Sequence, residues 1–463
     1  MAVLLVCVPR PISRFAAWGW LVAALASALL GVLQHVGMAH LLTPWVNDAL
    51  AGEVFANLRQ RNQFATLINI GLASLMAAMA SSPHRQAGES HGGAGPNGLP
   101  GWFRACLLLA AAVLLIVGDV LSRSRTGLAQ LVLLCLPMVW WYRVRAAGAL
   151  ASGLLAIYAV VSMVLAWGGP PAILERITTD LGCSSRKVLW SNVLDLIAQK
   201  PWLGWGWGEL DYAHYANLYG GERFCAILDN AHNLPLHLAV ELGGPAALLV
   251  CGVTLWAAVR AQPWRETDPT RQLAWTVLAM VVLHSMVEYP LWYGPFQMAV
   301  GLCVVMLWTS RPGAAAVPVD KVRRFRALPQ LVALVLLAGV GYAAWDYHRI
   351  SQLYLPPDQR AAAYRADALG RARQSWLFRN QVAFAELTLT PLTRDNAAPV
   401  NAMATQLLHY SPEPRVIEKV IESAVLLQRD DEALWHLARY RAAFPKEHAA
   451  WVAGNARGAA RAQ

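Results

Sequence analysis

Charged residues are scarce in this chain. They make up 14% of its 463 residues, against about 25% in an average soluble domain. Hydrophobic residues account for 57%, and the mean hydropathy is positive. A soluble enzyme is therefore not expected, and the composition favours a membrane protein.

Several motifs of well-known enzyme classes are also absent. The sequence holds no paired CxxC motifs, no HExxH, no Walker loop and no GxGxxG after a predicted strand, so zinc and nucleotide sites of these kinds are not indicated. The segments that we place outside the membrane lack DxD-like acidic clusters, which disfavours metal-dependent glycosyl transfer. We expect neither a metal nor another cofactor.

Few cysteines lie in polar surroundings. Four of the seven, Cys106, Cys135, Cys251 and Cys303, fall inside apolar runs, where a thiol behaves as a small hydrophobic group. Cys183 and Cys225 share one long polar segment. A disulfide between them and a pair of free thiols are both compatible with this pattern.

The formal net charge of +10 is typical of a nucleic-acid-binding protein, but most basic residues sit in short segments between apolar runs. Membrane topology explains such placement better. We therefore expect a lipid bilayer and no nucleic acid as a partner.

Apolar runs long enough to cross a hydrocarbon core of about 30 Å recur as far as Trp345. Met1 to Val8 is too brief for a cleavable signal peptide, so the first span would serve as an uncleaved signal. The sequence predicts a transmembrane body over 1–345 and a soluble helical domain over 346–463. We predict about nine spans, at 16–36, 64–80, 103–121, 127–141, 148–167, 233–259, 273–288, 296–309 and 331–345.

The basic residues give the orientation of these spans. If the N-terminus is cytoplasmic, every segment on that side contains arginine or lysine, as the positive-inside rule requires. The segments 37–63, 122–126 and 168–232 and everything after Trp345 then lie outside. These four external segments, among them the long loop at 168–232, are where chemistry should be sought.

The last hundred or so residues are predicted to be helical. Apolar residues recur there at three- and four-residue spacing, most clearly at 357–373 and 413–443. The segments 415–427 and 431–444 resemble a tetratricopeptide-like helix pair, although no clean repeat period is present. The fold class is thus all-α, a polytopic membrane body followed by a soluble helical interaction domain.

Two arginines, Arg123 and Arg125, lie in an external turn, where the topology rule disfavours them. A guanidinium can bind a phosphate through two parallel hydrogen bonds and stays charged at any relevant pH, which suits the diphosphate of a lipid carrier. Contact with lipid headgroups is the alternative. Arg59 and Arg61 repeat the anomaly ahead of another span, which strengthens the interpretation as an anion site.

The long loop ends at Ala231-His232-Asn233, directly before an apolar segment that contains Glu241-Leu242-Gly243. Because an imidazole titrates near neutral pH, His232 is the best candidate for a general base. A structural histidine at a membrane interface is the alternative, and it is the interpretation that we give to His237. Further along, His284 and Glu288 fall at the outer end of another span, where burial requires partners for them.

Tryptophan and glycine alternate within Pro201 to Gly208, which rules out a regular amphipathic helix there. Tryptophans at this depth belong either to the aromatic belt at the membrane interface or to a surface on which sugars stack.

Taken in order, these motifs resemble the O-antigen ligase superfamily, and most closely its bacterial protein O-oligosaccharyltransferase branch. The resemblance runs from about Ala51 to Ser310, and the helical tail favours this branch over lipopolysaccharide ligases. It rests on Arg61-Asn62-Gln63, Ser124-Arg125-Thr126-Gly127, Arg186 with Trp190, Pro201-x-x-Gly204-x-Gly206, Ala231-His232-Asn233 with Glu241-Leu242-Gly243, and His284-Ser285-x-x-Glu288-x-Pro290.

The resemblance implies a GT-C-like glycosyltransferase in the bacterial inner membrane, with its active site and C-terminal domain in the periplasm. It implies an undecaprenyl-diphosphate-linked glycan as donor and a periplasmic acceptor, such as a pilin-like protein. His232 would be the base, and Arg125 and Arg186 would hold the diphosphate with help from Arg61. Arg123, Asn233, His284 and Glu288 would support them.

Members of this family have more helices ahead of the Arg-Asn-Gln segment than the one span found here. The chain therefore either begins inside a longer gene product or is a shortened variant. An O-antigen ligase or polymerase, with lipopolysaccharide core or a growing glycan as acceptor, is the alternative with the same fold. A transporter is less favoured, because transporters place polar residues near the bilayer midplane.

Overall fold

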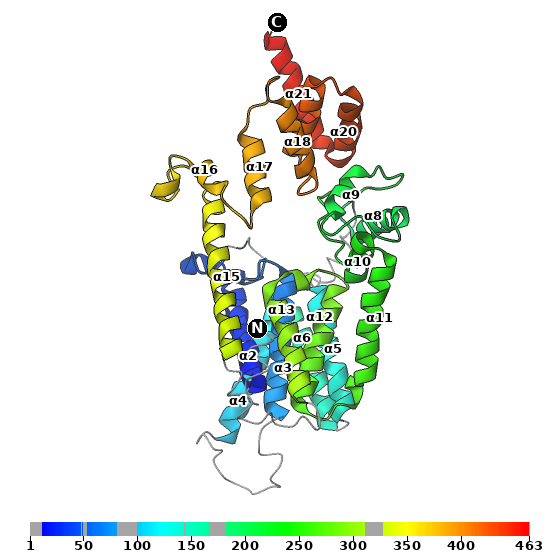
Figure 1. Cartoon of the computed structure of the whole chain (residues 1–463). Coiled ribbons are helices and arrows are strands. Elements are labelled where there is room, and N and C mark those ends of the chain that lie inside the picture. Colours follow the sequence, from blue (N-terminus) through cyan, green and yellow to red (C-terminus); the bar gives the residue numbers. More distant parts are fainter. Residues whose placement is uncertain are drawn as a thin grey trace. The chain divides into compact units, whose positions relative to one another are not determined.

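The computed structural model describes residues 12–47, 49, 53–80, 100–142, 145–165, 182–310 and 327–462, and within these residues the chain is helical and forms no β-strand. The chain divides into two compact units. Unit 1 comprises Met1–Thr179 with Val253–Gln330, and unit 2 comprises Asp180–Gly252 with Leu331–Gln463. Figure 1 shows both units.

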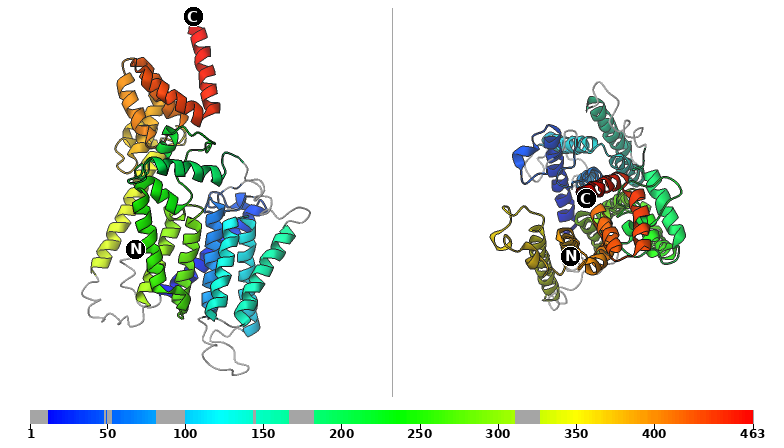
Figure 2. Two further views of the ribbon diagram at one scale, coloured as in Figure 1. Left: turned by 90° about the vertical axis from the view of Figure 1, so that its right-hand side faces the viewer. Right: turned by 90° about the horizontal axis from the view of Figure 1, so that it is seen from above.

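Unit 1 is a bundle whose helices stand side by side (Figures 1 and 2). Its helices α3, α2 and α4 pack on one another, and α3 also contacts α5 and α12. Phe64, Ile68 and Leu115 are fully buried in the core between them. The bundle consists of α2 (Ile12–His35), α3 (Arg61–Ala80), α4 (Gly101–Leu121), α5 (Arg125–Tyr142), α6 (Arg145–Leu165), α12 (Pro269–Ser285) and α13 (Gly294–Thr309), with the 3₁₀ helices η1 (Ala39–Leu42), η3 (Pro263–Arg265) and η4 (Pro290–Trp292).

Small residues allow the closest helix contacts in this bundle. A Cβ on Gly71 of α3 would lie 2.3 Å from the Cβ of Ala24 in α2, so only glycine permits this approach. Helix association inside a membrane depends on such close packing, because lipid tails are as apolar as the side chains.

The described part of the chain contains six helices that are long and apolar enough to cross a membrane. They are Arg14–His35, Arg61–Met79, Gly101–Leu121, Gly148–Leu165, Gly244–Arg265 and Gln330–Ser351, and Arg125–Leu136 and Gly294–Thr309 are shorter apolar helices. The predicted all-α polytopic fold is confirmed, and the protein is a multi-pass membrane protein.

One predicted span is wrong in its extent. The apolar run 233–259 is not a single helix but two, α10 (Leu234–Leu242) and α11 (Gly244–Ala261). The break falls at Gly243, whose backbone has φ +90° and ψ 160°, a region essentially restricted to glycine. The candidate membrane span therefore begins only at Gly244, and α10 lies outside it.

Unit 2 joins the long loop to the C-terminal tail. Its tail helices α18, α19 and α20 pack in succession, as expected for helix hairpins in series (Figure 2). Helix α9 of the loop packs on α20, and Tyr215 of α9 lies in the same core as Leu407 and Val416 of the tail. The helices of this unit are α8 (Arg186–Gln199), α9 (Leu210–Ala216), α10, the start of α11, most of α15 (Ala327–Ser351), η5 (Ala362–Tyr364), α16 (Ala368–Ala372), α17 (Arg379–Leu389), α18 (Ala397–Leu408), α19 (Pro414–Leu426), α20 (Asp430–Ala443) and α21 (Pro445–Ala462).

Candidate active site

Three of the polar motifs meet at one end of unit 1, where α3 and α5 begin and α4 and α12 end. Asn62, in the first turn of α3, accepts a hydrogen bond from Ser124 Oγ at 2.6 Å and donates one from Nδ2 to Glu288 Oε1 at 3.1 Å. One amide thus ties the Arg-Asn-Gln helix start to the arginine-bearing turn and to the segment after α12.

His284 lies in the same region and is completely buried. Its Nδ1 is 2.9 Å from Thr66 Oγ1, which donates its own hydrogen to Asn62 O and accepts another from Gln130 Nε2. The His284–Thr66 contact links α12 to α3, and Gln130 extends this link to α5.

The turn that bears Arg123 and Arg125 alternates between buried serine and exposed arginine. Ser122 and Ser124 are buried, and their hydroxyls hold the turn: Ser122 Oγ accepts from Ser124 N at 3.1 Å, and Ser124 Oγ accepts from Gly127 N at 3.0 Å. Arg123 adopts a left-handed backbone with φ 52°. The turn thus presents both guanidinium groups on a fixed backbone.

Arg61 stands at the first residue of α3. Its Nη2 is 3.4 Å from Glu53 Oε1, and both side chains are partly exposed. An ion pair of this kind is worth little on its own, so Arg61 remains able to exchange Glu53 for a phosphate oxygen.

Sequence reasoning did not select Asp119 of α4, although its side chain is only 1% exposed. A Cβ on Gly127 would lie 2.3 Å from Asp119 Oδ1, which explains the glycine that ends the Ser-Arg-Thr-Gly motif. Asn69 of α3 donates to Gly127 O at 3.2 Å and helps to hold the same helix start. A single acidic residue inside an apolar run was the signal that could have found Asp119.

In unit 2, His232 sits at a left-handed position with φ 50°, immediately before α10. Its backbone N–H donates to Asn230 Oδ1 at 2.9 Å, and Asn233 caps α10 by accepting from Leu236 N at 3.1 Å. The indole of Trp190 in α8 donates to Ala231 O at 3.1 Å. Hydrogen bonds therefore fix the backbone on both sides of His232. The His232 side chain is half-buried.

The Trp-Gly segment packs against the end of α10 through its backbone. Trp205 N donates to Val240 O at 2.8 Å, Gly206 N to Glu241 O at 3.0 Å, and Gly244 N to Pro201 O at 2.8 Å. A Cβ on Gly204 would lie 2.4 Å from the Glu241 carbonyl, and one on Gly243 would lie 2.1 Å from Trp202 O. The Pro201 to Gly206 motif and the Glu241-Leu242-Gly243 motif therefore pack directly against each other.

His237 and Glu241 form a pair beneath this contact. His237 Nε2 is 3.5 Å from Glu241 Oε2, and both side chains are only 2% exposed. Burial lowers the pKa of His237 to about 4, with nearby His232 contributing, and burial raises the pKa of Glu241 to about 7 against a hydrogen bond from the Gly208 backbone. Burial disfavours both charges, so the pair is neutral in mildly acidic solution.

Arg186 begins α8, one residue after the helix cap formed by Ser185, whose Oγ accepts from Val188 N at 3.4 Å. A disulfide joins Cys183 to Cys225, with the two Cα atoms 5.4 Å apart. This bond resolves the alternative that the sequence leaves open, and it ties the start of α8 to the segment that leads into His232.

The predicted site residues thus fall into two groups. Unit 1 holds Arg61, Arg123, Arg125, His284 and Glu288, and unit 2 holds Arg186, His232 and Asn233. Hydrogen bonds of Asn62, Ser124 and Thr66 join the segments that bear the first group. Arg186 lies on the disulfide-closed loop, and His232 lies just before the start of α10. In the described residues, no group of three or more His, Cys, Asp or Glu side chains is arranged to hold a metal ion.

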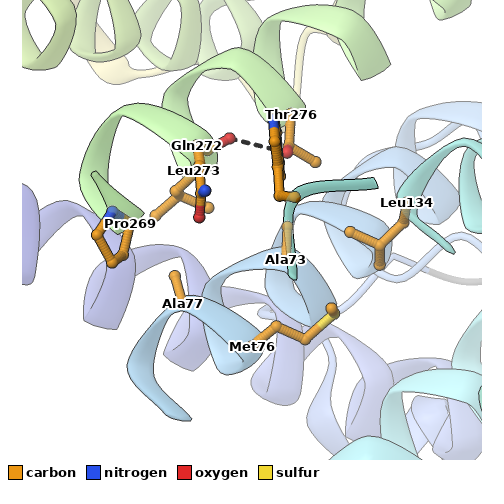
Figure 3. Close-up of a pocket in the computed structure, with 9 residues that line it drawn as sticks. Ala73, Met76, Ala77, Leu134, Pro269, Gln272, Leu273 and Thr276 are labelled. Carbon is orange, nitrogen blue, oxygen red and sulfur yellow. Dashed lines mark hydrogen bonds between the residues drawn. The ribbon is translucent and has the colours of Figure 1, made fainter. Parts of the chain in front are cut away.

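A small cavity lies at the opposite end of α3 and α12 from the polar motifs. Figure 3 shows it between Ala73, Met76 and Ala77 of α3 and Gln272 and Thr276 of α12. Its volume is about 30 Å³, which admits a water molecule but no sugar. This cavity is therefore not a glycan site.

Three family models match consecutive segments of the chain. A protein glycosylation ligase model matches residues 54–77, an O-antigen ligase model matches 110–251, and a model of the C-terminal part of virulence factor membrane-bound polymerases matches 272–458. Arg61 lies in the first match, Arg125 and His232 lie in the second, and Glu288 lies in the third.

A general O-oligosaccharyltransferase of Acinetobacter baylyi is 26% identical to the chain over 179 residues. The aligned segment covers 37% of this chain and 30% of that protein, so the chain spans less than a third of the length of this curated relative. No solved structure gives a significant match. The ordered matches and this relative agree in what the chain is similar to: O-antigen ligases and protein glycosylation ligases, with a general O-oligosaccharyltransferase among the similar proteins.

Proposed function

We propose that this protein is a glycosyltransferase that moves a glycan from an undecaprenyl-diphosphate carrier to a serine or threonine hydroxyl of an exported protein. The observation that carries the proposal is the turn from Ser122 to Gly127. Buried serines fix its backbone, Arg123 and Arg125 are exposed on it, and Asn62 ties it to two other motifs of the family.

The arginines suit the leaving group. As the bond between sugar and carrier breaks, negative charge gathers on the diphosphate. A guanidinium held on a fixed turn stabilises that charge without having to reorganise during the reaction. We assign diphosphate binding to Arg125 and Arg186, with Arg61 as a helper that leaves Glu53 when phosphate is present.

His232 is the proposed base. The acceptor hydroxyl oxygen forms a bond to the anomeric carbon, the bond from that carbon to the diphosphate oxygen breaks, and His232 takes the hydroxyl proton. The electron pair of the broken bond stays on the carrier diphosphate. One direct displacement inverts the configuration at the anomeric carbon. Asn233 and Asn230 support the role of His232 by fixing the backbone on either side of it.

We place the loop and the C-terminal domain in the periplasm, and the body in the bacterial inner membrane. The Cys183–Cys225 bond supports this orientation, because disulfides persist on the oxidising side of the membrane. The arginine and lysine distribution supports it independently.

The test is expression in a bacterium that makes a lipid-linked glycan but has no other transferase for it. Wild-type protein should add the glycan mass to an exported acceptor such as a pilin-like protein, and His232→Ala should abolish the addition while the variant still inserts. Leu434→Ala, on an exposed surface of the tail helix α20, is the matched control and should leave the addition unchanged. Normal glycosylation by His232→Ala would contradict the general-base assignment.

An O-antigen ligase or polymerase is the second candidate, and the names of two matching family models favour it. The same experiment separates the two. A mass increase on exported protein supports the first function, whereas new lipopolysaccharide bands or longer glycan chains without protein modification would support the second.

A further inference from the structure

The Trp-Gly turn is fastened to the point where a candidate membrane span begins. Gly244, the first residue of α11, donates its N–H to Pro201 O at 2.8 Å, and the Trp202 carbonyl lies so close to Gly243 that a side chain there would collide with it. Trp202 and Leu203 are therefore held beside the start of α11.

The start of α11 is also the start of an apolar surface. The span Gly244–Arg265 is long and apolar enough to cross a bilayer. In its second turn, Leu248 is 76% exposed and Leu249 67% exposed. In a spanning helix such side chains meet lipid tails, so the residues directly before Leu248 lie near the boundary between headgroups and hydrocarbon.

Trp202 and Leu203, held beside the start of this helix, are exposed apolar side chains as well. Trp202 is 75% exposed and Leu203 is 86% exposed, and the loop packing covers neither. Trp205 behaves differently, since its indole nitrogen donates to Leu196 O at 3.0 Å and Lys200 Nζ lies 4.0 Å from its ring centre. The segment therefore separates a tryptophan that packs inward from an apolar tip that no described residue of unit 2 covers.

We propose that Trp202 and Leu203 are a membrane anchor that inserts into the headgroup layer of the bilayer. Removing apolar side chains of this size from water is favourable, and an indole is favoured at that depth because its ring is apolar while its N–H remains accessible to water. The partner is the lipid surface, because the tip is fastened to the residues at which the candidate membrane span of α11 begins.

The segment that bears the anchor is also bonded to α10. Trp205 N and Gly206 N bond to carbonyls of α10, the helix that begins two residues after His232. These backbone bonds join the anchor to the last turn of α10. The inference on lipid contact is independent of the proposed catalytic function.

Nitroxide labelling tests the anchor. In a background in which Cys7, Cys106, Cys135, Cys251 and Cys303 are replaced by alanine and the Cys183–Cys225 bond is kept, Leu203→Cys is labelled and the full chain is placed in lipid nanodiscs. The matched control is Leu434→Cys in α20, a leucine that is 61% exposed on the tail. Power saturation then compares the accessibility of each label to oxygen, which concentrates in lipid, and to a water-soluble nickel chelate.

We expect the ratio of oxygen to nickel accessibility to be several-fold higher at position 203 than at position 434. Equal nickel accessibility at both positions would overturn the proposal. Trp202→Cys serves as a second variant. If Cys183 and Cys225 do not react with thiol reagents, their disulfide is intact in that variant and the loop is closed as in the wild type. If the label at 203 is shielded only when each disc holds two copies, the tip contacts a second chain instead and the lipid anchor is wrong.

Discussion

Replacing Gly243 with alanine should loosen the Trp-Gly turn from α10. The Gly243 backbone lies at φ +90° and ψ 160°, where a residue with a Cβ is strained by about 1–3 kcal/mol. The new Cβ would also lie 2.1 Å from Trp202 O, a backbone atom that no side-chain rotation can move away. The turn must therefore shift, and the bonds from Trp205 N, Gly206 N and Gly244 N must weaken.

Hydrogen exchange with mass spectrometry measures this effect. A loss of about 2–3 kcal/mol corresponds to exchange that is roughly 30- to 140-fold faster at those amides. Gly252→Ala is the matched control, because it lies within α11 with no atom within 4 Å of its added Cβ, and alanine stabilises a helix by roughly 0.5–1 kcal/mol relative to glycine. Unchanged protection of residues 205, 206 and 244 in Gly243→Ala would refute the packing argument.

Replacing Cys183 and Cys225 by serine removes a disulfide between residues 42 positions apart, which should lower the free energy of unfolding of the loop by about 4 kcal/mol. Denaturant-dependent proteolysis measures this loss, and an unchanged denaturation midpoint would contradict it. Between pH 4.5 and 6.5 the lowered pKa of His237 makes the free energy of unfolding rise with pH, and the raised pKa of Glu241 makes it fall. The two effects nearly cancel in the wild-type loop, which should then lose stability from pH 6.5 toward pH 7. Glu241→Gln should convert this into stability that rises between pH 4 and 6.5, as measured by amide exchange corrected for its intrinsic pH dependence, and a flat profile in the variant would show that His237 is not held neutral. Asn62→Ala removes the partner of Ser124 and Glu288, which should cost about 1–3 kcal/mol and lower the melting temperature in detergent, whereas an unchanged melting temperature would mean that water replaces the amide.

The sequence predicted the bundle well because a membrane span needs a continuous apolar run, and such a run is visible locally. It failed at Gly243, where the run 233–259 continues through a break in the helix. The break coincides with a close approach of Trp202 O, about forty residues earlier in the chain. Apolar periodicity carries no information about such a contact, and the Gly243-Gly244 pair was the only local sign.

In the candidate site, too, local motifs were visible in the sequence, whereas contacts between distant residues were not. The order of the motifs predicted Arg125 and His232 as candidates, but not Asn62 as the residue that joins three of the motifs. Thr66, Asn69 and Gln130 were not selected, because a single polar residue on an apolar helix does not reveal which helix it faces. His284 contacts Thr66 and so links two helices, and its support of the reaction stays a prediction.

Transfer by the purified protein tests the central claim most directly. The full chain in nanodiscs is given an undecaprenyl-diphosphate-linked glycan and a serine-containing peptide, and glycopeptide and released carrier are measured together. The account predicts equal amounts of both products, a rate that is about 10²- to 10⁴-fold lower in His232→Ala, and weaker donor binding in Arg125→Ala with donor binding retained in His232→Ala. Glycopeptide formation at the wild-type rate by His232→Ala would contradict the account.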